Sequence, residues 1–257
     1  MNQNHLQEYD FSGRVALVTG GTRGIGRQIA FRLGQAGAKV VVNYRSNQVA
    51  ADSTIAEFRK AGMNCMAVAA DVSNQQEVLR LVAETEDRMG PIDLLVNNAG
   101  VFDYLNHAEL DAERWRHTME TNVDSMFYCT WAVKDKMIER QFGRVVNITS
   151  IAGLEAKPYA IAYATSKAAM IGFTRSAGHA FASHNVRVNA VAPGLIDTEI
   201  LADVEQDVLQ QLIDRTPAGR IGTVDDVASL VLFLLSEQAD YISGQTMVVS
   251  GGRVTLP

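Results

Sequence analysis

The stretch from Ala16 to Gly26, "ALVTGGTRGIG", decides how this chain folds. It starts as an apolar run and continues into a turn in which glycines surround Thr22 and Arg23. Residues 24–37 follow with apolar side chains at three- and four-residue steps, which is typical of a helix with one buried face. The stretch therefore predicts a buried strand, a glycine-rich turn and a helix in immediate succession.

The same alternation continues along the chain. Short runs rich in apolar residues lie at 14–20, 38–44, 65–72, 93–100, 143–150, 186–194 and 245–252. Most of them are apolar on both faces, which is typical of strands covered by helices on both sides. Residues 75–90 and 223–238 repeat the helical period, so we expect an α/β fold with right-handed crossovers and a mostly parallel sheet. With no linker or repeat in between, residues 1–257 are expected to form a single domain with a polar tail at 1–12.

Composition excludes several classes of protein. The 257 residues carry a net charge of −6, and the Lys and Arg residues are scattered, so no nucleic-acid or anionic-membrane footprint is present. No apolar run approaches the roughly 18 residues of a membrane span, and the opening "MNQNHLQEYDFSG" lacks the apolar core of a signal peptide. Cys65 and Cys129 are isolated in apolar runs, which favours buried free thiols. We expect a soluble cytoplasmic protein without a metal site.

The glycine-rich turn has the chemistry of a phosphate site. In a doubly wound sheet this turn lies at the carboxyl edge, where the following helix directs its first N–H groups outward. Pyrophosphate oxygens fit there when glycine keeps side chains out of the way. The spacing of Gly20, Gly24 and Gly26 is one residue longer than the common dinucleotide fingerprint. A simple turn remains the alternative, but the position between strand and helix favours a bound nucleotide.

The end of the second strand indicates which nucleotide. Units that bind NAD usually carry an acidic residue about 20 residues after the glycines, and here Asn43 is followed by Arg45 and Ser46. Together with Arg23 in the turn, these residues predict a site for the 2′-phosphate of NADP(H). The alternative is that Arg45 is an ordinary solvated residue.

Polar residues also follow the third, fourth and fifth predicted strands. Asp71 is expected either to accept a hydrogen bond from an adenine amino group or to cap the next helix. Asn97 and Asn98 are expected to face the crevice at the carboxyl edge, and Ser150 ends the next strand at the same edge.

Tyr163 and Lys167 are four residues apart in a helix-forming segment and should share one face. Reduction of a ketone needs a hydride and a proton, and a neighbouring ammonium should lower the pKa of the phenol toward neutrality. Ser150 could polarise the substrate oxygen, and Asn122 could lead through water to Lys167. Taken alone, Ser150 also fits a turn cap and Asn122 a structural amide.

These motifs resemble a known family. "TGGTRGIG", "NNAG", Asn122, Ser150, "YATSK" and the Pro193–Gly194 pair resemble, in order and spacing, the single-domain short-chain dehydrogenases/reductases. The resemblance implies a doubly wound Rossmann-type three-layer sandwich with a seven-stranded parallel sheet in the order 3-2-1-4-5-6-7. It also implies a homotetramer and a substrate lid at residues 194–215.

The resemblance further implies a catalytic tetrad of Asn122, Ser150, Tyr163 and Lys167, with Lys167 on the nicotinamide ribose and Thr198 on the nicotinamide amide. The residues expected to bind the cofactor are Gly20, Thr22, Arg23, Gly24, Ile25, Gly26, Arg45, Ser46, Asp71, Val72, Asn98, Ala99, Gly100, Tyr163, Lys167, Pro193, Gly194, Ile196 and Thr198.

Within the family, "NYRS", "GRIGTVDDVASLVLFLLSE" and "YISGQT" are most similar to 3-oxoacyl-[acyl-carrier-protein] reductases. This implies reduction of a 3-oxoacyl thioester or related carbonyl. Those reductases dock an acidic carrier protein with two arginines, but the corresponding residues here are Gln141 and His184. Arg140, Arg144 and Arg187 are close by in sequence and are candidates to replace them.

The substrate walls are expected in "VFDYLNHAEL", "GLEAKPYAIA" and "LIDTEILADVEQ", and Tyr159 lies one helical turn before Tyr163. Two other functions stay open. The chain could oxidise a secondary alcohol, sugar or steroid, or it could sense a dinucleotide without catalysis. The presence of both Tyr163 and Lys167 favours an enzyme.

Overall fold

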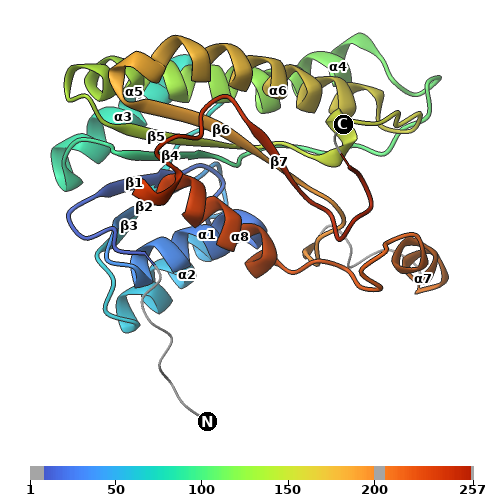
Figure 1. Cartoon of the computed structure of the whole chain (residues 1–257), viewed down its shortest axis with the longest axis horizontal. Coiled ribbons are helices and arrows are strands. Elements are labelled where there is room, and N and C mark those ends of the chain that lie inside the picture. The colour runs from blue at the N-terminus through green and yellow to red at the C-terminus, as the bar shows by residue number, and fades with distance from the viewer. Residues whose placement is uncertain (1–8, 200–205, 256–257) are drawn as a thin grey trace.

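A computed structural model describes residues 9–199 and 206–255. They contain a seven-stranded parallel sheet in the order β3-β2-β1-β4-β5-β6-β7, which confirms the predicted architecture (Figure 1). The strands are β1 (Val15–Val18), β2 (Lys39–Tyr44), β3 (Cys65–Ala69), β4 (Leu94–Asn97), β5 (Gly143–Ile148), β6 (Val186–Pro193) and β7 (Thr246–Val249). The chain crosses from one half of the sheet to the other between β3 and β4. Because β1 and β4 are neighbours in the sheet, this reversal opens a crevice at their carboxyl ends.

Helices cover both faces of the sheet (Figure 1). One layer consists of α1 (Gly24–Gln35), α2 (Gln48–Lys60) and α8 (Val224–Leu235), and the other of α3 (Gln75–Met89), α5 (Ser125–Glu139) and α6 (Ile161–Phe181). Alternate residues of β1 pack against different helical layers. Ala16 and Val18 pack against the first layer, and Val15 and Leu17 pack against the second. This two-sided burial explains why the strands are apolar on both faces.

The remaining elements lie around the carboxyl edge and the connections. The chain enters α5 through α4 (Ala112–Met119) and a π-helical turn, η1 (Glu120–Asp124). Short 3₁₀ turns follow β5, α6 and α8 as η2 (Ile151–Gly153), η3 (Ala182–His184) and η5 (Glu237–Ala239). Helix α7 (Gln206–Asp214) stands apart from both helical layers (Figure 1).

The sequence also predicted buried cysteines, a polar N-terminal tail and a lid. Cys65 and Cys129 are buried free thiols, as predicted, and burial raises the pKa of Cys129 to about 12. Residues 1–8 of the expected tail lie outside the described residues, whereas Phe11 is buried and its N–H donates to the carbonyl of Ala36. Residues 200–205 of the expected lid also lie outside the described residues. Among the described residues, no helix is long and apolar enough to cross a membrane.

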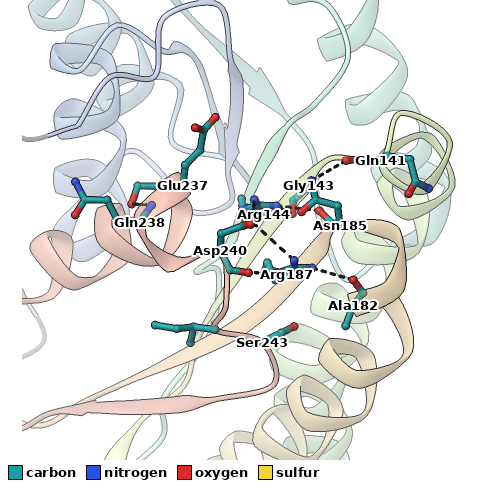
Figure 2. Close-up of polar contacts among 12 residues, drawn as sticks. Gln141, Gly143, Arg144, Ala182, Asn185, Arg187, Glu237, Gln238, Asp240 and Ser243 are labelled. Atoms are coloured by element: carbon teal, nitrogen blue, oxygen red, sulfur yellow. Dashed lines mark hydrogen bonds and ion pairs between the residues drawn. The ribbon is translucent and has the colours of Figure 1, made fainter.

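A polar network joins the amino ends of β5 and β6 (Figure 2). Arg144 is only 1% exposed, and its guanidinium donates to Asp240 at 2.6 Å and to the carbonyl of Asn185 at 2.9 Å. Arg187 donates to the carbonyls of Asp240 and Ala182 at 2.6 and 2.9 Å. Both guanidinium groups are therefore committed to contacts within the chain.

Candidate active site

The glycine-rich turn between β1 and α1 has a backbone that requires glycine. Gly20 and Gly24 have φ angles of +60° and +50°, which L side chains rarely adopt. A Cβ on Gly26 would stand 2.4 Å from Nδ2 of Asn98 and 2.5 Å from the carbonyl oxygen of Gly20. The spacing of the glycines is therefore fixed by turn geometry and by close packing against the end of β4.

Helix α1 begins without a side-chain cap. Helices α2, α3, α4 and α8 are capped by Asn47, Asn74, Asp111 and Thr223, whereas the cap residue of α1, Arg23, accepts no hydrogen bond from the first turn. The first N–H groups of α1 consequently lack a side-chain acceptor and combine with the positive end of the helix dipole. This donor set is suited to phosphate oxygens.

Asn98 holds the glycine turn in place. Its side chain donates to the carbonyls of Thr19 and Gly20 at 3.0 and 3.1 Å, and its N–H donates to the hydroxyl of Thr19 at 3.0 Å. The N–H of Ala99 donates to the same hydroxyl at 3.0 Å. Thr19, which the sequence analysis did not single out, therefore joins the ends of β1 and β4.

The expectation that Asn97 faces the crevice is wrong. Its side chain donates to Asn147 at 2.9 Å and to Thr130 at 3.1 Å, and Asn147 donates to Thr174 of α6 at 2.9 Å. Successive side chains of a strand point to opposite faces, so Asn97 is directed into the layer of α5 and α6. Asn97 is 3% exposed and belongs to a buried polar chain between sheet and helices.

Asn43 is buried at the end of β2, and the hydrogen bonds of its side chain go to backbone groups. Its Nδ2 donates to the carbonyl of Ala70 at 2.9 Å, and its Oδ1 accepts from the N–H of Gly20 at 3.4 Å. Arg45 and Ser46 follow at the surface, and Arg45 makes no ion pair with any described residue. Arg23 is 3.4 Å from Glu199, so the second expected cation already has an acidic neighbour.

Asp71 does not cap a helix, which excludes one of its two interpretations. Its Oδ1 accepts from the N–H and the hydroxyl of Ser73 at 3.0 and 2.7 Å, and the cap of α3 is Asn74. The turn places Asp71 just after β3, at the same edge as the glycines. Its neighbour Val72 is buried in the core beneath α3.

The candidate tetrad is assembled by α6, η1 and η2. Tyr163 and Lys167 lie on α6, Asn122 lies in the π-helical turn η1, and Ser150 caps η2 by accepting from the N–H of Ala152 at 3.1 Å. A Cβ on Gly153 would stand 2.8 Å from the backbone of Lys167, so η2 packs directly on α6. This contact keeps Ser150 beside the tyrosine face of the helix.

Asn122 is fully buried and bridges three segments. It accepts from the N–H of Val101 at 2.8 Å and donates to the carbonyl of Val101 at 3.0 Å and to the hydroxyl of Ser166 at 2.9 Å. Ser166 in turn donates to the carbonyl of Tyr163 at 2.7 Å. Ser166 lies inside the "YATSK" motif but was not predicted as a site residue.

Lys167 is buried beside Gly100 and Asn122. Its ammonium donates to the carbonyl of Ile148 at 2.9 Å, and a Cβ on Gly100 would stand 3.6 Å from its Nζ. Burial disfavours the charged form and lowers the pKa of Lys167 to about 8. Gly100 is exposed, and any larger residue at this position would place its side chain in the space beside the amine of Lys167.

The expected lowering of the tyrosine pKa is not found. Burial raises the pKa of Tyr163, and a hydrogen bond with Ser150 opposes that shift without cancelling it. The Nζ of Lys167 lies 5.6 Å from the centre of the Tyr163 ring and donates to Ile148 instead. Desolvation therefore outweighs the ammonium, and the phenol keeps its proton at neutral pH.

The segment after β6 also lies at the carboxyl edge of the sheet. Pro193 ends β6, and a Cβ on Gly194 would stand 2.9 Å from Ser250. Ile196 anchors the segment in the core, and the methyl group of Thr198 lies 3.6 Å from the position of a Cβ on Gly24. Thr198 thus lies over the glycine turn. Among the described residues, no group of three or more His, Cys, Asp or Glu is arranged to hold a metal ion.

Comparison with known proteins agrees with this arrangement. The family described as "Enoyl-(Acyl carrier protein) reductase" matches residues 20–253. A 3-oxoacyl-[acyl-carrier-protein] reductase of Synechocystis sp. is 41% identical over 95% of this chain and 98% of the relative. The enzyme of the same name from Aquifex aeolicus is 36% identical over 95% of this chain and 99% of the relative.

Solved structures give the same fold with other substrate names. A putative gluconate dehydrogenase from Agrobacterium tumefaciens aligns with a TM-score of 0.92 and 31% identity, over 96% of this chain and 98% of the other. A putative short-chain alcohol dehydrogenase from Sinorhizobium meliloti aligns with a TM-score of 0.91 and 34% identity, over 95% and 97% of the two chains. The similar proteins thus share an architecture but differ in the alcohol or carbonyl compound they are named for.

The buried amine of Lys167 predicts a specific pH dependence of stability. Its pKa is about 8 in the folded chain against 10.5 as an ordinary value, so unfolding takes up a proton between these pH values. The free energy of unfolding therefore increases as the pH rises from about 8 to 10.5. Below pH 8 the lysine is charged in both states, and the folded chain bears the full cost of burying that charge. Lys167→Met should therefore raise the free energy of unfolding by about 1–3 kcal/mol at pH 7, allowing for the lost hydrogen bond.

Denaturant unfolding at pH 7 and at pH 10 measures this effect. The difference between Lys167→Met and the unmodified chain should shrink at the higher pH, because the lysine is then neutral in the folded state. An equal difference at both values would contradict the desolvation of Lys167.

Proposed function

The chain belongs to the short-chain dehydrogenase/reductase family, and we propose that it is an NADPH-dependent reductase that converts a ketone into a secondary alcohol. The family uses a nicotinamide dinucleotide and acts on carbonyl and alcohol groups. The observation that carries the proposal is the meeting of Ser150, Tyr163 and Lys167 with the uncapped glycine turn at one edge of the sheet.

The site suits the expected cofactor. The free N–H groups of α1 and the side-chain-free surface of Gly24 match a pyrophosphate, and Thr198 lies close enough to contact a ligand above that turn. The dihydronicotinamide supplies the hydride when it is bound. The residues proposed to hold the cofactor are those named in the sequence analysis, with Asn98 and Thr19 acting through the shape of the turn.

Tyr163 is the proposed proton donor. Its raised pKa keeps the phenol protonated at neutral pH, which is the state that reduction requires of an acid. Ser150 donates to the developing negative charge on the substrate oxygen, and Lys167 favours the phenolate left behind. Asn122 binds the backbone of Val101 and the hydroxyl of Ser166, and so holds the segment after β4 against the turn of α6 that carries Tyr163.

NADPH rather than NADH is proposed because of the charges after β2. Arg45 is exposed and without an ionic partner among the described residues, and the end of β2 carries no carboxylate. The contribution of Arg23 is weaker because Glu199 lies 3.4 Å from it, although both side chains are more than 70% exposed. The main cation for a 2′-phosphate is therefore Arg45.

The substrate is proposed to be a small ketone or a 3-oxoacyl thioester. Delivery by an acidic carrier protein has little support, because Arg144 and Arg187 are committed within the network of Figure 2. Arg140 donates to Asp93 and to the carbonyl of Ile92 at 2.5 and 2.6 Å. The dehydrogenase names of the similar structures support a second candidate function, oxidation of a secondary alcohol at the same site.

The region 194–215 is proposed as a lid over the substrate, and the chain is proposed to form a cytoplasmic homotetramer. The oligomer is supported by an aromatic row on α5 and α6. Trp131 lies 4.5 Å from Phe127 and 6.0 Å from Phe173 between ring centres, and Phe127 and Trp131 remain 36% and 42% exposed. Such rings are typical of a surface that another subunit covers.

Replacement of the proton donor tests the reaction. Tyr163→Phe should lower kcat by about 10²–10⁴-fold and leave NADPH binding intact, because only the hydroxyl is removed. Lys167→Ala should impair both, since the proposal gives it a role toward the phenolate and the ribose. The measurements are NADPH absorbance with a panel of ketones and NADPH fluorescence titration. Turnover near the unmodified rate in Tyr163→Phe would exclude this residue as the acid.

Replacement of Arg45 tests the cofactor. A guanidinium–phosphate hydrogen bond contributes about 1.5–3 kcal/mol, so Arg45→Ala should raise KM for NADPH by about 10- to 100-fold and barely change KM for NADH. The buried position of Asn43 makes Asn43→Asp a poor companion, because a carboxylate there would face backbone carbonyls. Ser46→Asp introduces the repulsion at the surface instead. An NADPH-to-NADH ratio indifferent to both changes would contradict the proposal.

Sedimentation tests the oligomer. Four chains of 28.0 kDa predict a species of about 112 kDa at micromolar concentration. Trp131→Glu should shift the distribution toward smaller species, because a buried unpaired charge is unfavourable at an interface. A monomer in the unmodified protein would contradict the proposed tetramer.

A further inference from the structure

We propose that this site selects a neutral ketone that carries an aromatic ring, and that Phe102 and Tyr104 recognise the ring. The inference rests on the proposed function, since it takes Tyr163 as the group that reaches the carbonyl oxygen. It is drawn from the loop after β4, residues 101–110, and from the segment just before α6.

Phe102 lies directly against the proposed proton donor. Its ring centre is 4.9 Å from that of Tyr163, and the two rings are nearly perpendicular at 85°. Phe102 is nevertheless 42% exposed, so Tyr163 covers only part of the ring. A substrate whose carbonyl reaches the Tyr163 hydroxyl has this open aromatic surface as its immediate neighbour.

Tyr104 and Tyr159 form a second aromatic surface farther out. Their rings are stacked at 5.4 Å with an angle of 20°, and they remain 70% and 51% exposed. The N–H of Leu105 donates to the carbonyl of Tyr159 at 2.8 Å, which fixes the loop to the segment before α6. The hydrogen bond from the residue after Tyr104 and the stacking of the two rings thus both hold Tyr104 beside Tyr159.

The loop of residues 101–110 is packed against the start of α6. Leu105 and Leu110 of the loop line a cavity of only about 10 Å³ together with residues at the start of α6, among them Tyr163. A cavity of this size holds at most one water molecule, so the loop is packed closely against the start of α6 while the rings of Phe102 and Tyr104 remain exposed. Aromatic rings that are held open in this way provide a preformed surface for another ring, which can stack or approach edge-on.

The charges around the rings disfavour an anionic substrate. Residues 101–110 contain Asp103 and Glu109 but neither Lys nor Arg. Lys157, the one such cation in residues 151–160, is paired with Glu155. Neither stretch therefore offers a phosphate-bearing thioester an unpaired Lys or Arg, whereas an uncharged aromatic ketone needs no such cation.

The reaction on such a substrate is an ordinary reduction. The hydride forms a C–H bond at the carbonyl carbon, the C=O π bond breaks, and the oxygen takes the proton of Tyr163. NADPH is oxidised to NADP⁺ and the ketone is reduced to a secondary alcohol, so that one further proton from solvent restores Tyr163.

A matched set of substrates tests the inference with the full chain and NADPH. Ethyl 3-oxo-4-phenylbutanoate carries the aromatic ring one methylene away from the ketone, ethyl 4-cyclohexyl-3-oxobutanoate carries a saturated ring of similar size, and acetoacetyl-coenzyme A is the anionic thioester. We expect kcat/KM for the aromatic ester to exceed that for the saturated ester by about three- to tenfold, as aromatic pairing contributes beyond buried area. The thioester should be the poorest of the three.

Two variants assign the preference to its residues. Tyr104→Ala and Phe102→Leu should each reduce the ratio of aromatic to saturated ester toward one. Tyr241→Ala is the matched control, because Tyr241 is fully exposed and belongs to no part of the site. It should leave both the ratio and the activity unchanged. A ratio near one in the unmodified protein, or a ratio that Tyr104→Ala and Phe102→Leu leave intact, would overturn the inference.

Binding without cofactor separates this inference from the proposed function. Calorimetric titration of the full chain with the two ketoesters measures recognition of the ring in the absence of any reaction. Loss of turnover on every ketone, with tighter binding of the aromatic ester that Tyr104→Ala abolishes, would refute the proposed reaction and support the aromatic site. Equal binding of the two esters would refute the aromatic site whether or not turnover occurs.

Discussion

The hydrogen bonds from Asn98 and Ala99 to Thr19 and Gly20 join the end of β4 to the end of β1. They lie at the one place where neighbouring strands of the sheet come from its two halves. The crevice at this place depends on their geometry, because the same asparagine also packs against Gly26 and limits that position to glycine. The shape of the glycine-rich turn is therefore set from outside the turn, by the end of a strand almost 80 residues away in the sequence.

The site is built from buried polar groups that are costly to fold. Asn122 is fully buried, and Lys167 is 4% exposed. Asn122 has a partner for both ends of its amide, so its burial is compensated by hydrogen bonds. Lys167 has a single oxygen partner, and its pKa of about 8 is the sign that this compensation is incomplete. Such imperfect satisfaction is typical of groups kept for chemistry rather than for stability.

The proposed function and the proposed substrate choice assign the reaction and the recognition of substrate to different parts of the molecule. The groups proposed to move protons lie on α6, η1 and η2, which are packed against the sheet and against one another. The aromatic rings of Phe102 and Tyr104 lie on a connection after β4, where sequence can change without disturbing the sheet. Such a separation agrees with the names of the similar proteins, which include a 3-oxoacyl-[acyl-carrier-protein] reductase, a putative gluconate dehydrogenase and a putative alcohol dehydrogenase.

The sequence by itself determined the parallel sheet, the glycine turn and the position of Tyr163 and Lys167 on one face of a helix, because each depends on local periodicity or short spacing. Only the tertiary structure decided that Asn98 holds the turn while its neighbour Asn97 points into the helices. It also decided that Glu199 lies beside Arg23 and that burial raises the pKa of Tyr163. The alternation of side chains along a strand shows only that Asn97 and Asn98 point to opposite faces, and it does not decide which of them meets the helices. Contacts between distant segments and desolvation depend on what surrounds a residue in space.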